Sequence, residues 1–102
     1  MMHSFLIVGD ELKRQAALEE LLAEHKVAPT SILVFPQEGL GYGIETTRDI
    51  IQTLATRTTN RGENRAIVIQ EAHLLTIAAQ NALLKTLEES ASDTLIILLV
   101  RG

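Results

Sequence analysis

Residues Ala66–Glu71 read Ala-Ile-Val-Ile-Gln-Glu, an apolar run that ends in two polar side chains. A near-continuous apolar run of this kind predicts a strand of a parallel sheet that is buried on both faces. At the carboxyl end of such a strand, an Asp-Glu pair would hold Mg²⁺ and orient a water for attack on a γ-phosphate. Gln70 occupies the first of these positions, and a neutral amide is a much poorer ligand for Mg²⁺ than a carboxylate. The outline of a phosphate-hydrolysing site is therefore present without a central part of its chemistry.

Turn-forming residues and apolar periodicity on both sides of this strand predict alternating strands and helices. Besides the strand that ends at Ile69, apolar runs predict strands at Phe5–Val8, Ser31–Phe35 and Leu95–Val100. Helical spacing predicts helices from the N-cap Asp10 through Leu22, from Glu45 through Leu54, and from the N-cap Thr76 through Leu87. A polar loop is expected at Arg57–Asn64. This alternation predicts one α/β domain over residues 1–102, with a parallel sheet covered on both faces.

The composition of the 102 residues excludes several classes of protein. Without cysteine there is no disulfide and no thiolate metal site, and His3, His25 and His73 are too dispersed to predict another metal centre. A net charge of −4 argues against a dedicated nucleic-acid binder. The longest apolar runs are far shorter than the roughly 20 residues of a membrane span, and no signal segment opens the chain. We therefore expect a cytoplasmic protein with no metal ion and no membrane contact.

The segment after the buried strand carries the most specific motif. Gln80–Glu89 reads Gln-Asn-Ala-Leu-Leu-Lys-Thr-Leu-Glu-Glu and closely resembles the segment that follows the second phosphate-binding motif of bacterial clamp-loader subunits. These subunits are AAA+ proteins of the DNA polymerase III complex, and the catalytically silent delta-prime subunits are the nearest match. His3–Gly9 is similar to the first strand of the family, and Gly43–Ile50 is similar to the start of its next helix. The resemblance thus covers nearly the whole chain.

The resemblance implies a three-layer P-loop or AAA+-like fold, in which four parallel strands take the order 1-4-3-2 with helices on both faces. The family continues with a fifth strand beside the first. The chain is therefore expected to be a single truncated AAA+-like domain, the N-terminal portion of a clamp-loader subunit. One edge of Phe5–Val8 would then be open, and unpaired backbone groups on an apolar edge predict self-association of the isolated chain.

The first phosphate-binding motif is degenerate. A working loop needs G-x-x-x-x-G-K-[ST], because glycines let backbone N–H groups face the phosphates and the lysine supplies positive charge. At this place only Gly9 remains, followed by Asp10 and Glu11, and the nearest lysine is Lys13. We therefore expect an ordinary turn with Asp10 as helix N-cap, no nucleotide cofactor and no intrinsic ATPase activity.

The resemblance also assigns roles to single residues. Glu71 matches the water-orienting glutamate of the family but is expected to be vestigial, since Gln70 replaces the metal-holding aspartate. Arg48 matches a position at which related subunits place an arginine facing DNA phosphates, so DNA contact is expected only within an assembled ring.

Acidic residues at the end of the specific motif point to a partner. Lys85, Glu88 and Glu89 lie in the last turns of the predicted helix, where acids oppose the helix dipole, which suggests another reason for their presence. We interpret them as a contact with another clamp-loader subunit.

The expected function is that of an ATP-inert clamp-loader subunit or fragment, a structural and interaction module in DNA replication. Two alternatives stay open. One is a nucleotide-binding AAA+ ATPase with a degenerate phosphate loop, which Gln70 and the missing loop lysine disfavour. The other is a receiver-like signalling domain, suggested by the acid pair Asp10-Glu11 after the first strand. A receiver would also need an aspartate where this chain has Gln70.

Overall fold

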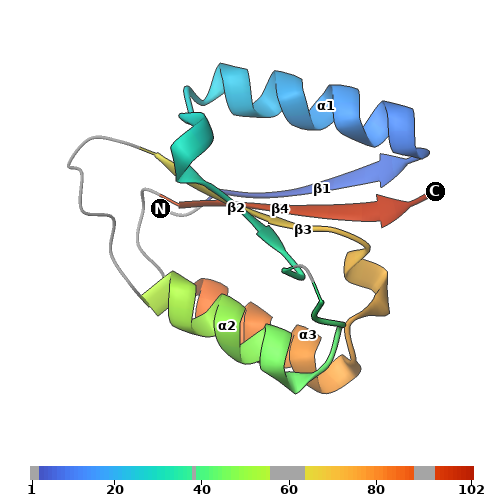
Figure 1. Ribbon diagram of the computed structural model, residues 1–102, viewed down its shortest axis with the longest axis vertical. Helices are drawn as coiled ribbons and strands as arrows, with labels where there is room; N and C mark the ends of the chain where they lie inside the picture. Colours follow the sequence, from blue (N-terminus) through green and yellow to red (C-terminus); the bar gives the residue numbers. More distant parts are fainter. Residues whose placement is uncertain (1–2, 38, 56–63, 89–93) are drawn as a thin grey trace.

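The computed structural model describes residues 3–37, 39–55, 64–88 and 94–102 (Figure 1). Strands and helices alternate along the chain, as the sequence predicts. In chain order the elements are β1 (His3–Gly9), α1 (Glu11–Glu24), the 3₁₀ turn η1 (Pro29–Ser31), β2 (Ile32–Phe35), α2 (Ile44–Ala55), β3 (Arg65–Ile69), the 3₁₀ turn η2 (Ala72–Leu74), α3 (Ile77–Glu88) and β4 (Thr94–Arg101).

The four described strands form one parallel sheet in the order β1-β4-β3-β2. The predicted fold class and the predicted order 1-4-3-2 are confirmed. The receiver-like alternative is wrong, because the first strand of a receiver lies inside a sheet of order 2-1-3-4-5. Here β1 is an edge strand of the described sheet.

Side-chain caps begin two of the helices, as predicted. Asp10 precedes α1, and its Oδ1 accepts a hydrogen bond from the backbone N–H of Lys13 at 2.8 Å. Thr76 precedes α3, and its Oγ1 accepts one from the backbone N–H of Ala79 at 3.1 Å. Such caps satisfy N–H groups that have no partner inside the helix.

Some predicted boundaries differ from the structure. β2 begins at Ile32 and not at Ser31, because the Ser31 N–H closes the preceding turn by donating to the carbonyl of Ala28 at 2.8 Å. Of the predicted polar loop, residues 56–63 lie outside the described part of the chain, as does Glu89 of the specific motif.

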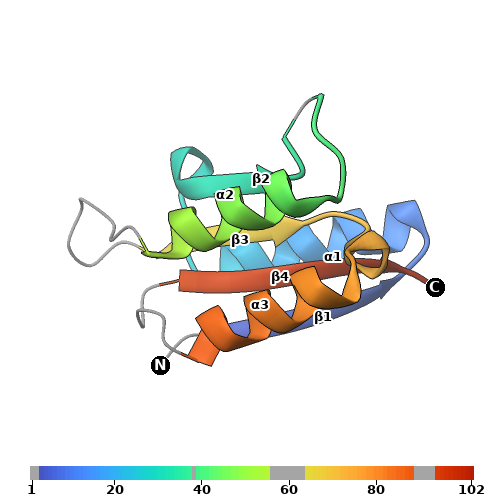
Figure 2. The same cartoon turned by 90° about the horizontal axis from the view of Figure 1, so that it is seen from below.

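Helices cover both faces of the sheet, with α1 on one face and α2 and α3 on the other (Figures 1 and 2). All five residues of β3 are buried, as expected for a strand enclosed on both faces. The core on the α1 side contains Leu18, Val27, Ala66, Val68, Leu95, Ile97 and Leu99. The core on the other side contains Phe35, Ile50, Ile67, Ile69, Ala72, Leu75, Ala79, Leu83 and Ile96. In the described part of the chain, no helix is long and apolar enough to cross a bilayer.

The edge strand β1 is covered unequally on its two faces. Phe5 and Ile7 pack into the core beneath α1. Leu6 and Val8 point to the opposite face and are 63% and 57% exposed, although they lie beside Leu98 and Val100 of β4 in the sheet register. In the described structure, this face of the edge strand β1 therefore presents apolar side chains to solvent.

Arg65 is a buried cation that the sequence did not predict as a structural residue. Its Nε and Nη2 donate to Thr94 Oγ1 at 3.1 and 3.0 Å, and its Nη1 donates to the carbonyl of Thr53 at 2.9 Å. Because Thr53 belongs to α2 and Thr94 to β4, these bonds connect a helix to the amino ends of the two central strands.

Candidate functional site

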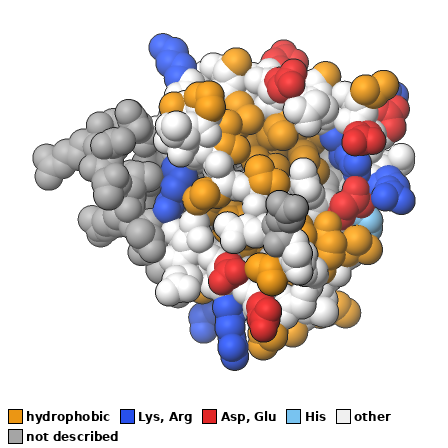
Figure 3. Space-filling model, in the orientation of Figure 1, with side chains coloured by type: hydrophobic (Ala, Val, Ile, Leu, Met, Phe, Trp, Pro, Cys, Tyr) orange, Lys and Arg blue, Asp and Glu red, His pale blue; other side chains and the backbone are white. Residues whose placement is uncertain are grey.

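The candidate site lies at the end of the sheet formed by the carboxyl ends of β1, β3 and β4. In open parallel sheets, ligands bind outside the carboxyl ends of the strands, at the point where the strand order reverses. A pocket of about 170 Å³ opens at this place. Its lining residues are Glu11, Arg14, Gln15, Gln70, Glu71 and Leu99. Figure 3 shows acidic, basic and histidine side chains gathered at this end of the molecule, where the arrowheads of β1 and β4 point in Figure 1.

The connection between β1 and α1 is a single residue, Asp10. A phosphate-binding loop needs several residues whose backbone N–H groups turn toward the phosphates. Here the N–H of Lys13 donates to the carboxylate of Asp10, and the carbonyl of Gly9 accepts a bond from the N–H of Gly102 at 3.2 Å. Gly9, Asp10 and Lys13 thus lie together at the start of α1.

Glu71 has a left-handed backbone conformation, with φ 48° and ψ 47°. Such a conformation is uncommon for residues other than glycine, and it persists where surrounding contacts hold it. Glu71 directly follows Gln70, whose N–H donates to the carbonyl of Phe35 at 2.8 Å and continues the pairing of β3 with β2. The left-handed turn therefore marks the point at which the chain leaves the sheet.

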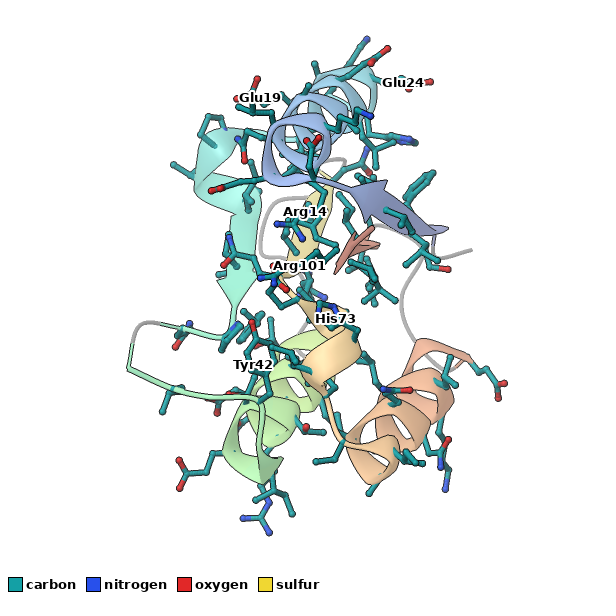
Figure 4. The ribbon with its side chains drawn as sticks, turned by 90° about the vertical axis from the view of Figure 1, so that its right-hand side faces the viewer. Arg14, Glu19, Glu24, Tyr42, His73 and Arg101 are labelled. Carbon is teal, nitrogen blue, oxygen red and sulfur yellow. The ribbon has the colours of Figure 1, made fainter. Side chains whose placement is uncertain are left out.

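Three positively chargeable side chains surround the carboxylate of Glu71. Arg14 Nη1 lies 3.0 Å from Glu71 Oε1, His73 Nε2 lies 3.3 Å from Oε2, and Arg101 Nη2 lies 3.6 Å from Oε2. We call Arg14, Glu71, His73 and Arg101 the Glu71 cluster. Figure 4 shows that Arg14, Arg101 and His73 follow one another along the edge of the sheet between α1 and η2.

The ion pair between Arg14 and Glu71 is the most protected contact of the cluster. The side chains of Arg14 and Glu71 are 12% and 20% exposed, whereas that of Arg101 is 73% exposed. Water screens exposed pairs strongly, so the contact with Arg101 contributes less. Arg14 Nη1 and Glu71 Oε2 are both buried without a hydrogen-bond partner in the described part of the chain. The side chains of Arg14 and Glu71 are therefore held together by the attraction of their charges more than by aligned hydrogen bonds.

Tyr42 lies in the loop after β2, on the same side of the molecule as His73 and Arg101 (Figure 4). Burial raises the pKa of the Tyr42 phenol above its ordinary value of 10.0, and the negative charge of Glu71 raises it further. Tyr42 is therefore close enough to Glu71 for the charge of this carboxylate to affect its pKa.

Comparison with known proteins identifies the family. The model of a family described as DNA polymerase III, delta subunit, matches residues 24–102. The chain belongs to this family. The predicted resemblance to clamp-loader subunits of the DNA polymerase III complex is thereby confirmed.

Two relatives of this DNA polymerase III family member support the assignment. Over 63 residues the chain is 41% identical to DNA polymerase III subunit delta' of Haemophilus influenzae, a match over 62% of this chain and 19% of that protein. It is also similar to the crystal structure of a DNA polymerase III gamma subunit-related protein from Thermotoga maritima, with a TM-score of 0.75 and 29% identity over 97% of this chain and 34% of that one. The chain thus spans about a fifth and about a third of the lengths of these two relatives.

The structure separates the other predicted site residues from the Glu71 cluster. Arg48 is exposed on α2, and Lys85 and Glu88 are exposed on α3. No hydrogen bond or ion pair found among the described residues connects them to Glu71. Within the same ranges, no group of three or more metal-type side chains lies close enough to hold an ion.

The partners of Glu71 were not predictable from local sequence. His73 is far in the sequence from the other two histidines, and no motif marks Arg101 or Tyr42. The signal that was available is the fold itself, because parallel strands bring their carboxyl ends to one edge. Arg101 ends β4 and Glu71 follows β3, so opposite charges at two neighbouring strand ends predict a contact.

Proposed function

We propose that residues 1–102 form a single AAA+-like domain that serves in DNA replication as an ATP-inert, delta-prime-like clamp-loader module. The observation that best supports the proposal is the Glu71 cluster, together with the one-residue connection between β1 and α1 at Asp10. Where an active relative would hold nucleotide phosphates, this chain has a one-residue turn and an internal ion pair.

The charges of the site disfavour a nucleotide triphosphate. Asp10 caps α1 with its own carboxylate, so the N–H groups that would attract a phosphate already face a negative charge. Glu11 and Glu71 add two more carboxylates to the lining of the pocket. A phosphate would have to displace Glu71 from Arg14 before it could reach the guanidinium.

In this proposal, Gln70 and Glu71 also do not bind Mg²⁺. Mg²⁺ prefers carboxylate and phosphate oxygens in octahedral geometry, and Gln70 offers one amide carbonyl. Glu71 is already engaged by Arg14 and by two further basic side chains. We therefore assign no cofactor to the chain, and Glu71 has a structural role in place of the water-orienting one.

The proposed partners are other clamp-loader subunits, which the family membership and the name of the Haemophilus relative support. Lys85 and Glu88 are exposed and accessible for such a contact, and Glu89 of the same motif lies outside the described residues. Arg48 is exposed on α2 and is proposed to meet DNA phosphates only inside an assembled ring. The cytoplasm, where replication proteins of this family act, is the proposed compartment.

The open edge of β1 is proposed to pair with a second copy when the chain is isolated. The Gly9 carbonyl faces β4, and backbone groups alternate along a strand, so those of Leu6 and Val8 face the open edge. No charged side chain within Ser4–Gly9 opposes the approach of an identical strand.

The alternative of an active ATPase with an unusual loop would need a phosphate-binding loop, which the one-residue turn at Asp10 does not offer.

Mixing the purified chain with purified clamp-loader ATPase subunits tests the proposal. We expect co-elution in size-exclusion chromatography that does not depend on ATP bound to this chain. A Lys85→Glu and Glu88→Lys double variant should weaken the complex, and a variant at the exposed Glu19 of α1 should not. Failure of the wild type to co-elute with any of the subunits would contradict the proposal.

A further inference from the structure

The Glu71 cluster has the arrangement of an anion-binding site. Arg14 comes from α1, His73 from η2 and Arg101 from the end of β4, and all three approach one carboxylate within 3.0 to 3.6 Å. Guanidinium groups that converge from different elements are typical of sites for carboxylate and phosphate oxygens. In this chain, the anion at the centre is a side chain.

The fit of this internal anion is incomplete. Arg14 Nη1 has no aligned hydrogen-bond acceptor among the described residues, although it lies 3.0 Å from Glu71 Oε1. Glu71 is tethered to a backbone in the left-handed conformation, which limits how its two oxygens can turn toward three donors. A free tetrahedral anion has no such tether and has more oxygens to share.

We infer that Arg14, His73 and Arg101 form a latent site for an inorganic phosphate-sized anion, and that Glu71 is its built-in occupant. The inference rests on the proposed function, since it states how an inert domain keeps α1 attached to the sheet without a nucleotide. A tethered carboxylate competes at a high effective concentration, so the wild type should not take up phosphate from solution.

The balance between the arginines and the carboxylates of the site decides whether an external anion can bind there. With Glu71 present, the two arginines face two carboxylates, Glu71 and the pocket-lining Glu11, and no net charge remains when His73 is neutral. Glu71→Gln leaves one positive charge in excess and frees Arg14 to contact another anion. Orthophosphate should then bind in the millimolar range, because Glu11 still opposes it.

The test measures thermal unfolding of the wild type and of Glu71→Gln during titration with sodium phosphate, at an ionic strength held constant with NaCl. Glu71→Gly is a second variant, because glycine adopts the left-handed conformation without strain and so favours a folded chain. We expect Glu71→Gln to melt about 4–8 °C below the wild type. Millimolar phosphate should restore a large part of this loss, and the wild type should not respond.

Two controls make the phosphate response specific. Arg14→Met in the Glu71→Gln background should abolish the response, and Glu19→Gln, on the same helix but outside the cluster, should melt and respond like the wild type. A folded Glu71→Gln or Glu71→Gly that ignores phosphate would overturn the inference. So would an equal response after Arg14→Met. If Glu71→Gln does not respond to phosphate and the wild type binds no Mg²⁺-ATP, only this inference is contradicted. If the wild type binds Mg²⁺-ATP, the proposed function is contradicted.

Discussion

The guanidinium of Arg14 lies 3.0 Å from the carboxylate of Glu71, and this contact connects the first helix to the end of the third strand. Both side chains are largely shielded from water, so the pair experiences less screening than a surface ion pair. In the proposed function, this contact takes the place of nucleotide phosphates at the carboxyl end of the sheet. The same two residues therefore account for both the attachment of α1 and the proposed loss of nucleotide binding.

Removing Arg14 should destabilise the fold more than removing Arg101. Arg14→Met leaves the largely shielded carboxylate of Glu71 with weaker partners, and we expect the free energy of unfolding to fall by about 1–3 kcal/mol. Arg101 is 73% exposed, so Arg101→Met should cost less than about 1 kcal/mol. Urea unfolding followed by circular dichroism measures both values. Equal losses for the two variants would contradict the assigned difference in burial.

The single tyrosine of the chain gives a direct optical probe of the site. Burial, and then the charge of Glu71, hold the pKa of Tyr42 above 10.0 in the folded state. The folded state therefore keeps the phenol proton at pH values where the unfolded chain has lost it. This stabilisation is fully present below pH 10.0 and is lost as pH rises through the folded pKa.

A spectrophotometric titration of tyrosinate absorbance tests this pKa, with the urea-unfolded chain as reference. The folded wild type should titrate at higher pH than the reference, and Glu71→Gln should titrate between the two because burial remains as the larger cause. A Glu71→Gln curve that coincides with that of the wild type would show that Tyr42 does not sense Glu71.

Leu6→Lys should shift the isolated chain toward monomer. Leu6 is 63% exposed on the open edge strand, whereas Ile7 packs beneath α1 and is unsuitable for a lysine. Val34→Lys is the matched control, because Val34 is 41% exposed on β2 at the other edge. Multi-angle light scattering at high micromolar concentration should find association of the wild type and of Val34→Lys and a monomer for Leu6→Lys. A concentration-independent monomer of the wild type would exclude pairing through β1.

Thr94→Val should destabilise the chain although it changes few atoms. Thr94 Oγ1 accepts two hydrogen bonds from the buried Arg65, and valine of similar shape accepts none. A buried guanidinium that loses acceptors costs about 1–3 kcal/mol, which urea unfolding would detect. Thr30→Val, at an exposed position, should change stability little. A near-neutral Thr94→Val would mean that other contacts of Arg65 suffice.

The elements whose cause is local were predictable from sequence. Asp10 and Thr76 cap the helices that follow them, because a cap needs only the next three residues. The buried strand before Gln70 follows from its continuous apolar run. The strand order came from the resemblance to clamp-loader subunits, with handedness rules limiting the alternatives.

Contacts between distant segments were not predictable in the same way. The pair of Arg14 with Glu71 depends on the angle at which α1 crosses the sheet, and nothing near either residue encodes that angle. The burial of Arg65 was not predictable either, since arginine is rarely buried, and its acceptors on α2 and β4 are far away in the sequence. The part of the site that sequence did indicate, Gln70 and Glu71, lies directly at a strand end.

The most direct test of the central claim is isothermal titration calorimetry of the wild-type chain with Mg²⁺-ATP. The claim of an ATP-inert domain predicts no heat of binding above dilution, for the wild type and also for Gln70→Asp, because a restored acid supplies neither a phosphate loop nor a loop lysine. Saturable binding with a micromolar dissociation constant in the wild type would contradict it.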